Sequence, residues 1–228
     1  MKALFADQPF NEKYHLGAVN SINWARILAQ TVYYFLAYFQ VRSQIPQPEG
    51  SEIQFVVPTG NFGDVLAGYY AKRMGLPMSK LVVATNSNDI LARFWRSGRY
   101  EQVDSTPEAP SKGALDGKSA DGGVQATLSP AMDILVSSNF ERLLWYLVYG
   151  TSSAAPESVR RDSAGATIDG WMKNVKSNGR VEVPVEVLEL ARRDFLAERV
   201  SDDQVGPACV SDQMTWFDND TLFRRFKR

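Results

Sequence analysis

The chain has 228 residues, of which 44% are hydrophobic and 22% charged, and its formal net charge is −1. These values are typical of a globular protein with a sizeable core. They argue against a broad basic surface for nucleic acid or an anionic membrane. The single cysteine, Cys209, excludes an intrachain disulfide and a cysteine-rich metal site. We expect a cytoplasmic protein, with no membrane span and no partner protein.

The first predicted helix lies in the segment NSINWARILAQTVYYFLAYFQ. Asn20 or Ser21 can cap its start, because both side chains accept hydrogen bonds from free first-turn N–H groups. We expect one face of this helix to pack on the core, since its apolar residues recur at helical spacing. That face contains Ala25, Leu28, Val32, Phe35, Leu36 and Phe39.

Two strand–loop–helix units follow. The expected elements are strands at residues 52–57 and 80–85 and helices at residues 63–75 and 87–98. This alternation predicts an α/β fold with an open, mostly parallel sheet flanked by helices. Ligands of such sheets bind at the carboxyl ends of the strands, where this chain has the loops TGNFG and TNSND.

The second half of the chain is less regular. The polar composition of residues 100–128 predicts a mobile surface loop. Ser138 and Glu141 have capping-box spacing before a helix that runs to Gly150. Residues 151–167 are predicted to form a polar connection. A last helix is expected at residues 183–199, with Leu188, Ala191 and Phe195 on one face.

The loop TGNFG combines features of an anion site. A strand that turns directly into a helix leaves backbone N–H groups free at the positive end of the helix dipole. Gly60 and Gly63 would let an anion approach the backbone, and Thr59 and Asn61 can add side-chain donors. The pattern is neither a dinucleotide fingerprint nor a Walker A loop, so the terminal phosphate of a small cofactor fits better. Alternatively, the glycines only shape a tight turn.

Four blocks together resemble threonine synthase in its fungal form. They read NSINWARILAQ, PTGNFGDVLAGYYAKRMGLP, ATNSNDILARF and SPAMDILVSSNFERLLWYL, and the resemblance extends over about residues 10–200. It implies a pyridoxal-phosphate enzyme with the tryptophan-synthase-β-like fold. The family converts O-phospho-L-homoserine and water to L-threonine and phosphate, as a carbon–oxygen lyase acting on phosphates. The expected cradle of the cofactor phosphate is Thr59, Gly60, Asn61, Phe62 and Gly63.

The resemblance also suggests a division of the chain. We expect residues 1–150 to form the α/β core that binds the cofactor phosphate. Residues 151–200 would form a helical insertion or extension, and residues 201–228 a divergent tail. The substrate has a phosphate of its own, and the polar residues Asn20, Ser21, Asn23 and Arg26 at a helix start are candidates to bind it. The alternative is ordinary helix capping beside a surface arginine.

The cofactor lysine of the family lies in an earlier block with a motif like GPTLAFKD, which these residues lack. Lys2 and Lys13 precede the NSINWAR block without that context. We therefore assign no catalytic residue and expect an incomplete fold, a central fragment that is inactive alone and poorly soluble. The alternative is a non-catalytic paralogue that binds pyridoxal phosphate or a phosphorylated metabolite.

Other polar residues receive structural roles. Asn86, Asn88 and Asp89 are expected to cap the helix that follows them. Asp133 and Arg142 are expected to pair with each other. His15 is the only histidine, and we predict a surface position for it. Cys209 has no histidine near it in sequence, so a nucleophilic role is not expected.

Overall fold

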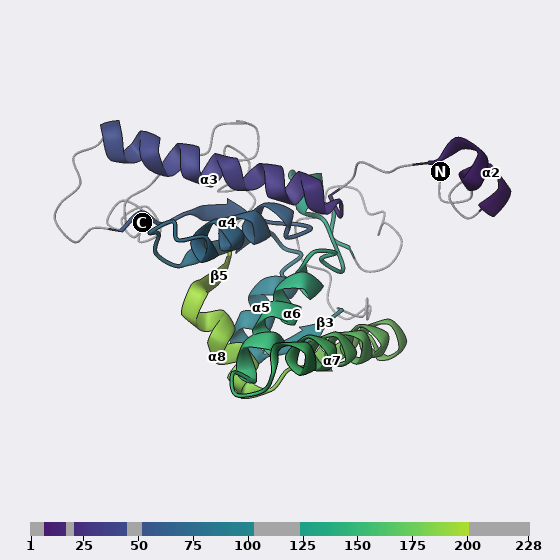
Figure 1. Ribbon diagram of the computed structural model, residues 1–228. Helices are drawn as coiled ribbons and strands as arrows, with labels where there is room; N and C mark the ends of the chain where they lie inside the picture. The colour runs from purple at the N-terminus through teal and green to yellow at the C-terminus, as the bar shows by residue number, and fades with distance from the viewer. Residues whose placement is uncertain (1–6, 17–20, 45–51, 103–123, 201–228) are drawn as a thin grey trace, which may run out of the picture.

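A computed structural model describes residues 7–16, 21–44, 52–102 and 124–200 (Figure 1). The helices are α2 (Gln8–Tyr14), α3 (Trp24–Gln44), α4 (Gly63–Arg73), α5 (Ile90–Ser97), the 3-10 helix η1 (Pro130–Met132), α6 (Phe140–Thr151), α7 (Glu157–Asn178) and α8 (Val185–Asp194). The strands are β1 (Val56–Pro58), β2 (Leu81–Thr85), β3 (Arg99–Glu101), β4 (Arg180–Glu182) and β5 (Phe195–Arg199). Helix α2 lies apart from the other elements in Figure 1.

The central sheet is parallel, as predicted, and its strand order is β1-β2-β5. Val56 pairs with Val82, and Leu81 pairs with Phe195. All five residues of β2 are buried, so the backbone groups on both of its edges need hydrogen-bond partners. Strand β5 satisfies one edge. This requirement explains why the helix predicted at residues 183–199 was wrong in its last five residues: α8 ends at Asp194 and the chain extends as β5.

The units β1-α4 and β2-α5 follow the predicted order, and α4 and β2 lie close to their predicted bounds. Strand β1 is shorter than predicted and begins at Val56, with only an isolated bridge at Ile53. Gly75 and Gly98 have positive φ angles of 102° and 76°, and Gly98 is the C-cap of α5. Both residues stand where the sequence predicted helix ends, because glycine adopts the left-handed conformation at little cost. A second, antiparallel sheet of β3 and β4 was not predicted.

The buried face of α3 is not the predicted one. Leu28, Val32, Leu36 and Phe39 are exposed, and Ala25 is exposed as well. The helix instead buries Ile27, Thr31, Tyr34, Ala37 and Val41. This helix is apolar on nearly all sides, so periodicity could not select the packed face.

Close contact between α3 and α4 selects that face. The Tyr34 hydroxyl donates to the Asp64 carbonyl oxygen at 2.9 Å. A Cβ atom at Gly68 would lie 2.6 Å from the Tyr34 ring, so only glycine permits this approach. The described residues therefore leave an apolar surface on α3 uncovered.

Helix α7 replaces the predicted polar connection at residues 151–167. Only Ala164, Ile168 and Val175 of its 22 residues are buried, so its apolar stripe is too narrow to recognise in the sequence. Ion pairs between residues four apart, such as Lys173–Asp169 at 2.6 Å, support its exposed face. Residues 151–200 thus contain two helices but also β4 and β5.

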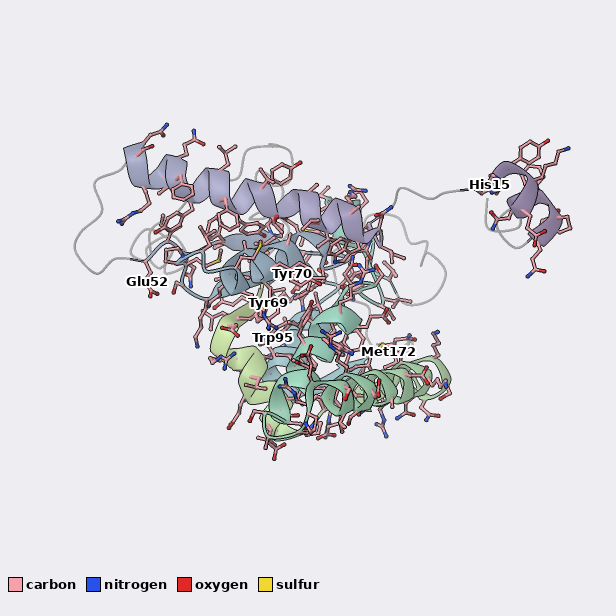
Figure 2. All side chains as sticks on the ribbon, in the orientation of Figure 1. His15, Glu52, Tyr69, Tyr70, Trp95 and Met172 are labelled. Atoms are coloured by element: carbon pink, nitrogen blue, oxygen red, sulfur yellow. The ribbon has the colours of Figure 1, made fainter. Side chains whose placement is uncertain are left out.

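An aromatic cluster joins these elements into one core. Phe62, Phe94, Tyr100, Phe140 and Phe195 are all at most 1% exposed. Figure 2 shows Trp95 and Tyr69 between α3–α4 and the lower helices. The predicted loop at residues 100–128 lies mostly outside the described residues, as does Cys209.

Candidate functional site

The loop between β1 and α4 turns its carbonyl groups toward the protein. The Gly60 carbonyl oxygen accepts from Ser137 Oγ at 3.0 Å, and the Asn61 carbonyl oxygen accepts from Asn139 N and Nδ2 at 3.1 and 2.9 Å. A trans peptide bond holds C=O and N–H on opposite sides. The N–H groups of Asn61 and Phe62 therefore point away from these partners.

The start of α4 adds a further donor to this group. The Gly63 N–H lies in the first turn of the helix and has no acceptor within it. Among the described residues, the N–H groups of Asn61, Phe62 and Gly63 donate to no protein atom. Three N–H groups at the positive end of a helix form a site that favours an anion.

Phe62 fixes the conformation of the loop. It is the N-cap of α4 and adopts a left-handed conformation, with φ 62° and ψ 9°. Its ring is 1% exposed and lies 5.3 Å from the Phe140 ring. The sequence placed Phe62 in the cradle but did not reveal that its side chain anchors the loop in the core.

The two glycines of the loop differ in their surroundings. A Cβ atom at Gly60 would lie 2.4 Å from the Ala131 carbonyl oxygen, so close backbone packing requires glycine there. At Gly63, the nearest atom to a Cβ would be Asn139 Nδ2 at 3.5 Å, an ordinary contact. Packing alone therefore accounts for Gly60, whereas the protein atoms around Gly63 would accept a side chain.

The predicted side-chain donors are partly engaged. The buried Thr59 hydroxyl donates to the Val57 carbonyl oxygen at 3.0 Å. Asn61 Nδ2 donates to Ser21 Oγ at 3.3 Å, which brings the cradle next to the second predicted cluster. A role for Thr59 in anion binding stays a prediction, and the backbone N–H groups are the available donors.

Asn139 links the loop to the start of α3. Its side chain is fully buried, and Nδ2 donates to the carbonyl oxygens of both Asn61 and Ser21, at 2.9 and 2.8 Å. Arg142 NH1 donates to Asn139 Oδ1 at 2.6 Å, and NH2 donates to the Ile22 carbonyl oxygen at 2.8 Å. These contacts join segments about 80 to 120 residues apart, and no local sequence signal predicts them.

The second predicted cluster is less buried than expected. Asn20 lies outside the described residues. Ser21 is half-buried beside Asn61, and Asn23 Oδ1 accepts from the Ala25 N–H at 3.0 Å. Arg26 is exposed. Asn23, rather than Asn20 or Ser21, thus directly precedes α3 and caps its first turn.

The polar residues after β2 form a network instead of a helix cap. Asn86 Nδ2 and Asn88 Nδ2 donate to Asp133 Oδ1 at 2.7 and 3.1 Å. Thr127 donates to Asp133 through its N–H and its hydroxyl. Asp89 is the N-cap of α5, but its side chain makes no capping bond and pairs with Arg93 at 2.9 Å. The capping roles predicted for Asn86 and Asn88 were therefore wrong, whereas Asp89 occupies the predicted N-cap position without a side-chain capping bond.

Two further predictions near this site were wrong, because the residues involved have other partners or positions. Asp133 and Arg142 do not pair, because Asp133 accepts from the network after β2 and Arg142 bonds Asn139. Helix α6 begins at Phe140 with Asn139 as its N-cap, so Ser138 and Glu141 form no capping box. His15 is exposed, as predicted.

Asp64, at the start of α4, has a buried carboxyl group. Burial raises the pKa of its carboxyl to about 6, and the nearby Tyr34 hydroxyl, which donates to the Asp64 carbonyl oxygen, opposes part of that rise. Within the described part of the chain, its buried Oδ1 atom has no hydrogen-bond partner. Well below pH 4 the carboxyl is protonated in both the folded and the unfolded chain, so it does not change the free energy of unfolding there. As the pH rises from 4 through 6, ionisation favours the unfolded chain.

We expect Asp64→Asn to remove this pH dependence. The free energy of unfolding of the unmodified chain should fall by about 2–3 kcal/mol between pH 4 and pH 7 through this group, and that loss should vanish in the variant. Urea unfolding at four pH values, with the exposed Asp162→Asn as a control, measures the difference. Parallel curves for Asp64→Asn and the unmodified chain would contradict the assignment.

Other site types are not evident in the described residues. No described helix is long and apolar enough to cross a membrane. The described residues also contain no group of three or more histidine, cysteine, aspartate or glutamate side chains arranged to hold a metal ion.

Known proteins with similar sequences and structures were found, although no protein-family model matches the chain. Threonine synthase of Schizosaccharomyces pombe is 54% identical over 204 residues, which cover 90% of this chain and 37% of that protein. Threonine synthase of Saccharomyces cerevisiae is 48% identical, over 90% of this chain and 35% of that protein.

Two solved structures agree with these relatives. The crystal structure of the yeast enzyme has a TM-score of 0.72 and 48% identity, covering 89% of this chain and 34% of its own. The pyridoxal-phosphate-bound threonine synthase of Brucella melitensis has a TM-score of 0.68 and 41% identity, covering 88% of this chain and 35% of its own. The chain spans little more than a third of the length of these proteins. Over about 90% of its length, the chain is therefore a homologue of threonine synthase.

Proposed function

We propose that this chain provides the phosphate-binding part of a pyridoxal-phosphate-dependent threonine synthase. The complete reaction would convert O-phospho-L-homoserine and water to L-threonine and phosphate, as a carbon–oxygen lyase reaction. The observation that carries the proposal is a set of three backbone N–H groups at the start of α4 that donate to no described protein atom. A cytoplasmic location remains part of the proposal.

The chemistry of this donor set suits the cofactor phosphate. The N–H groups of Asn61, Phe62 and Gly63 would bind the phosphate, and the space around Gly63 would let it approach the backbone. Pyridoxal phosphate supplies an electron sink when it is bound. The role proposed for the chain's own residues at the loop is to bind and orient the cofactor. Lys72 lies about 14 Å from Gly63 along the axis of α4.

Binding of a cofactor analogue without an aldehyde tests the proposal directly. We expect 4-deoxypyridoxine 5′-phosphate to bind the purified chain at least tenfold more tightly than 4-deoxypyridoxine in calorimetry, because only the former carries the phosphate. The analogue cannot react with lysines, so surface imines do not contribute. Equal affinities for the two compounds would refute a phosphate cradle.

A variant pair separates binding from folding in the same experiment. Gly63→Ala should lower the affinity for the phosphorylated analogue while changing the free energy of unfolding by less than about 1 kcal/mol, since its Cβ meets no close protein atom. Gly60→Ala should unfold at lower urea concentration, because its Cβ would meet the Ala131 carbonyl oxygen. Full analogue binding by Gly63→Ala would place the anion elsewhere.

We further propose that Asn20, Ser21, Asn23 and Arg26 face the phosphate of the substrate. The hydrogen bond between Asn61 and Ser21 supports this placement, as does the exposed guanidinium of Arg26. Arg26→Ala in an active threonine synthase carrying this segment should raise KM for O-phosphohomoserine at least tenfold, with a smaller effect on kcat. An unchanged KM would leave Arg26 as a surface residue.

A second candidate function is binding without catalysis. It uses the same three backbone N–H groups and keeps the phosphate cradle as a cofactor or metabolite site. Borohydride reduction with pyridoxal phosphate, followed by peptide mapping and a phosphate-release assay, separates the two candidates. We expect diffuse labelling and no turnover by this chain. One labelled lysine together with turnover would show that the chain catalyses the reaction alone.

We also propose the division at residues 150 and 200 as the domain organisation.

A further inference from the structure

A second concave site lies at the far ends of the helices that begin at the cradle. A cavity of about 550 Å³ is lined by the last turns of α4 and α6 and by residues of α7 and α8. Lys72 and Arg73 end α4, and Tyr149 and Gly150 lie near the end of α6. Because α4 and α6 also start at the loop, the two sites are separated by about three helical turns.

The lining of this cavity carries an excess of positive charge. Its charged residues are Lys72, Arg73, Arg160, Arg193 and Asp194. Asp194 pairs with Lys72 at 3.4 Å and with Arg193 at 3.0 Å, and it is the only acidic lining residue. Among the described residues, Arg73 and Arg160 have no carboxylate partner. A concave surface with uncompensated cations attracts anions.

Aromatic rings hold the two unpaired guanidinium groups in place. Arg73 lies over the Tyr146 ring at 4.9 Å, and Arg160 lies over the Tyr149 ring at 4.2 Å. Arg160 NH2 also donates to the Tyr149 hydroxyl at 2.7 Å, while its buried Nε has no partner among the described residues. Guanidinium groups fixed in this way lose little entropy when they bind a phosphate or carboxylate.

Stabilisation of helix ends does not account for all of the cations that line this cavity. Lys72, Arg73 and Arg193 complement the negative ends of α4 and α8, as last-turn cations do on ordinary surfaces. Arg160 stands in the first turn of α7, where a cation opposes the helix dipole. Its position therefore suggests a role beyond helix stabilisation. Burial raises the pKa of Tyr69, so this lining hydroxyl stays a neutral donor.

We propose that this cavity binds a small phosphate-bearing metabolite at a site distinct from the cofactor cradle. The volume suits a molecule of metabolite size rather than the flat contact of a protein surface. Arg73 and Arg160 would bind the phosphate through their forks, and Lys72 would add charge from the same wall. This site does not depend on the identity of the ligand in the cradle.

Titration with inorganic pyrophosphate, followed by backbone amide NMR, tests the site in the complete chain. Amides near Lys72, Tyr149 and Arg160 report on the cavity, and those of Asn61 and Gly63 report on the cradle. We expect both groups of signals to shift, with separate affinities. No shift of the cavity signals at millimolar pyrophosphate would overturn the proposal.

Matched variants assign the effect to the cavity. Arg160→Gln and Arg73→Gln should each weaken the cavity affinity at least tenfold and leave the cradle affinity unchanged. Arg73 is exposed, so that variant tests the site even if Arg160→Gln folds poorly. Arg161→Gln is the control, since it removes the same charge from the exposed face of α7. Equal losses in Arg160→Gln and Arg161→Gln, or tighter binding of a polyglutamate peptide than of pyrophosphate, would refute a metabolite site.

Discussion

Phe62→Ala should lower the free energy of unfolding by about 3–5 kcal/mol, because it removes a fully buried ring from the aromatic cluster. The ring contacts Phe140, Trp95 and Phe195, and each contact comes from a different element. Urea unfolding followed by circular dichroism measures the loss. Phe39→Ala, at a 62% exposed position on α3, is the matched control and should change stability by less than about 0.5 kcal/mol.

The left-handed backbone conformation of Phe62 allows a second comparison, between the alanine and glycine variants. Alanine keeps the conformational penalty of about 1 kcal/mol at φ 62°, whereas glycine removes it. Phe62→Gly should therefore be more stable than Phe62→Ala, which reverses the order expected within a helix. If Phe62→Ala were as stable as the control, or Phe62→Gly less stable than Phe62→Ala, the anchor described here would be wrong.

Asn139→Ala should lower the free energy of unfolding by about 2–3 kcal/mol and weaken binding of the phosphorylated cofactor analogue at least tenfold. The substitution removes both Nδ2 donors to Asn61 and Ser21 and leaves a guanidinium N–H of Arg142 without its acceptor. Only the Asn139 backbone N–H then holds the Asn61 carbonyl oxygen, so the peptide that presents the Phe62 N–H is less firmly oriented. Calorimetry with the analogue and urea unfolding measure the two effects separately.

An isosteric variant identifies which atoms of Asn139 matter. Asn139→Asp keeps the acceptor for Arg142 but places a carboxylate oxygen against two carbonyl oxygens, so it should lose at least as much affinity as Asn139→Ala. Asn174→Ala, at an exposed position on α7, should behave like the unmodified chain. Normal analogue binding by Asn139→Asp would show that the Asn139 side chain does not orient the loop.

The sequence predicts the part of the fold whose signals are local. Strands β1 and β2, helices α4 and α5 and the loop between β1 and α4 follow from short apolar runs and from glycines at helix ends. Each of these signals acts within a few residues, so neighbouring chain segments do not alter it. For the same reason the sequence locates the loop between β1 and α4.

The sequence does not predict features that depend on distant contacts. Phe195 has helical spacing with Leu188 and Ala191, yet the unpaired edge of β2 draws it into a strand. Helix α3 has apolar residues on two faces, and only the match between Tyr34 and Gly68 decides which one is buried. Asn139 looks like a cap for α6, but its side chain reaches carbonyl groups far away in the sequence.

The pairing of β2 with β5 has a consequence for how this chain folds. Val56 pairs with Val82 after a short connection, whereas Leu81 pairs with Phe195, more than one hundred residues later. Closing the longer connection costs roughly 1 kcal/mol more entropy. Contacts between β1, α4 and β2 can therefore form early. The second edge of β2 is paired only when β5, the last described element, is in place. During synthesis on a ribosome, β2 would expose a strand edge until β5 emerges, and that interval is when the chain is most open to wrong pairing.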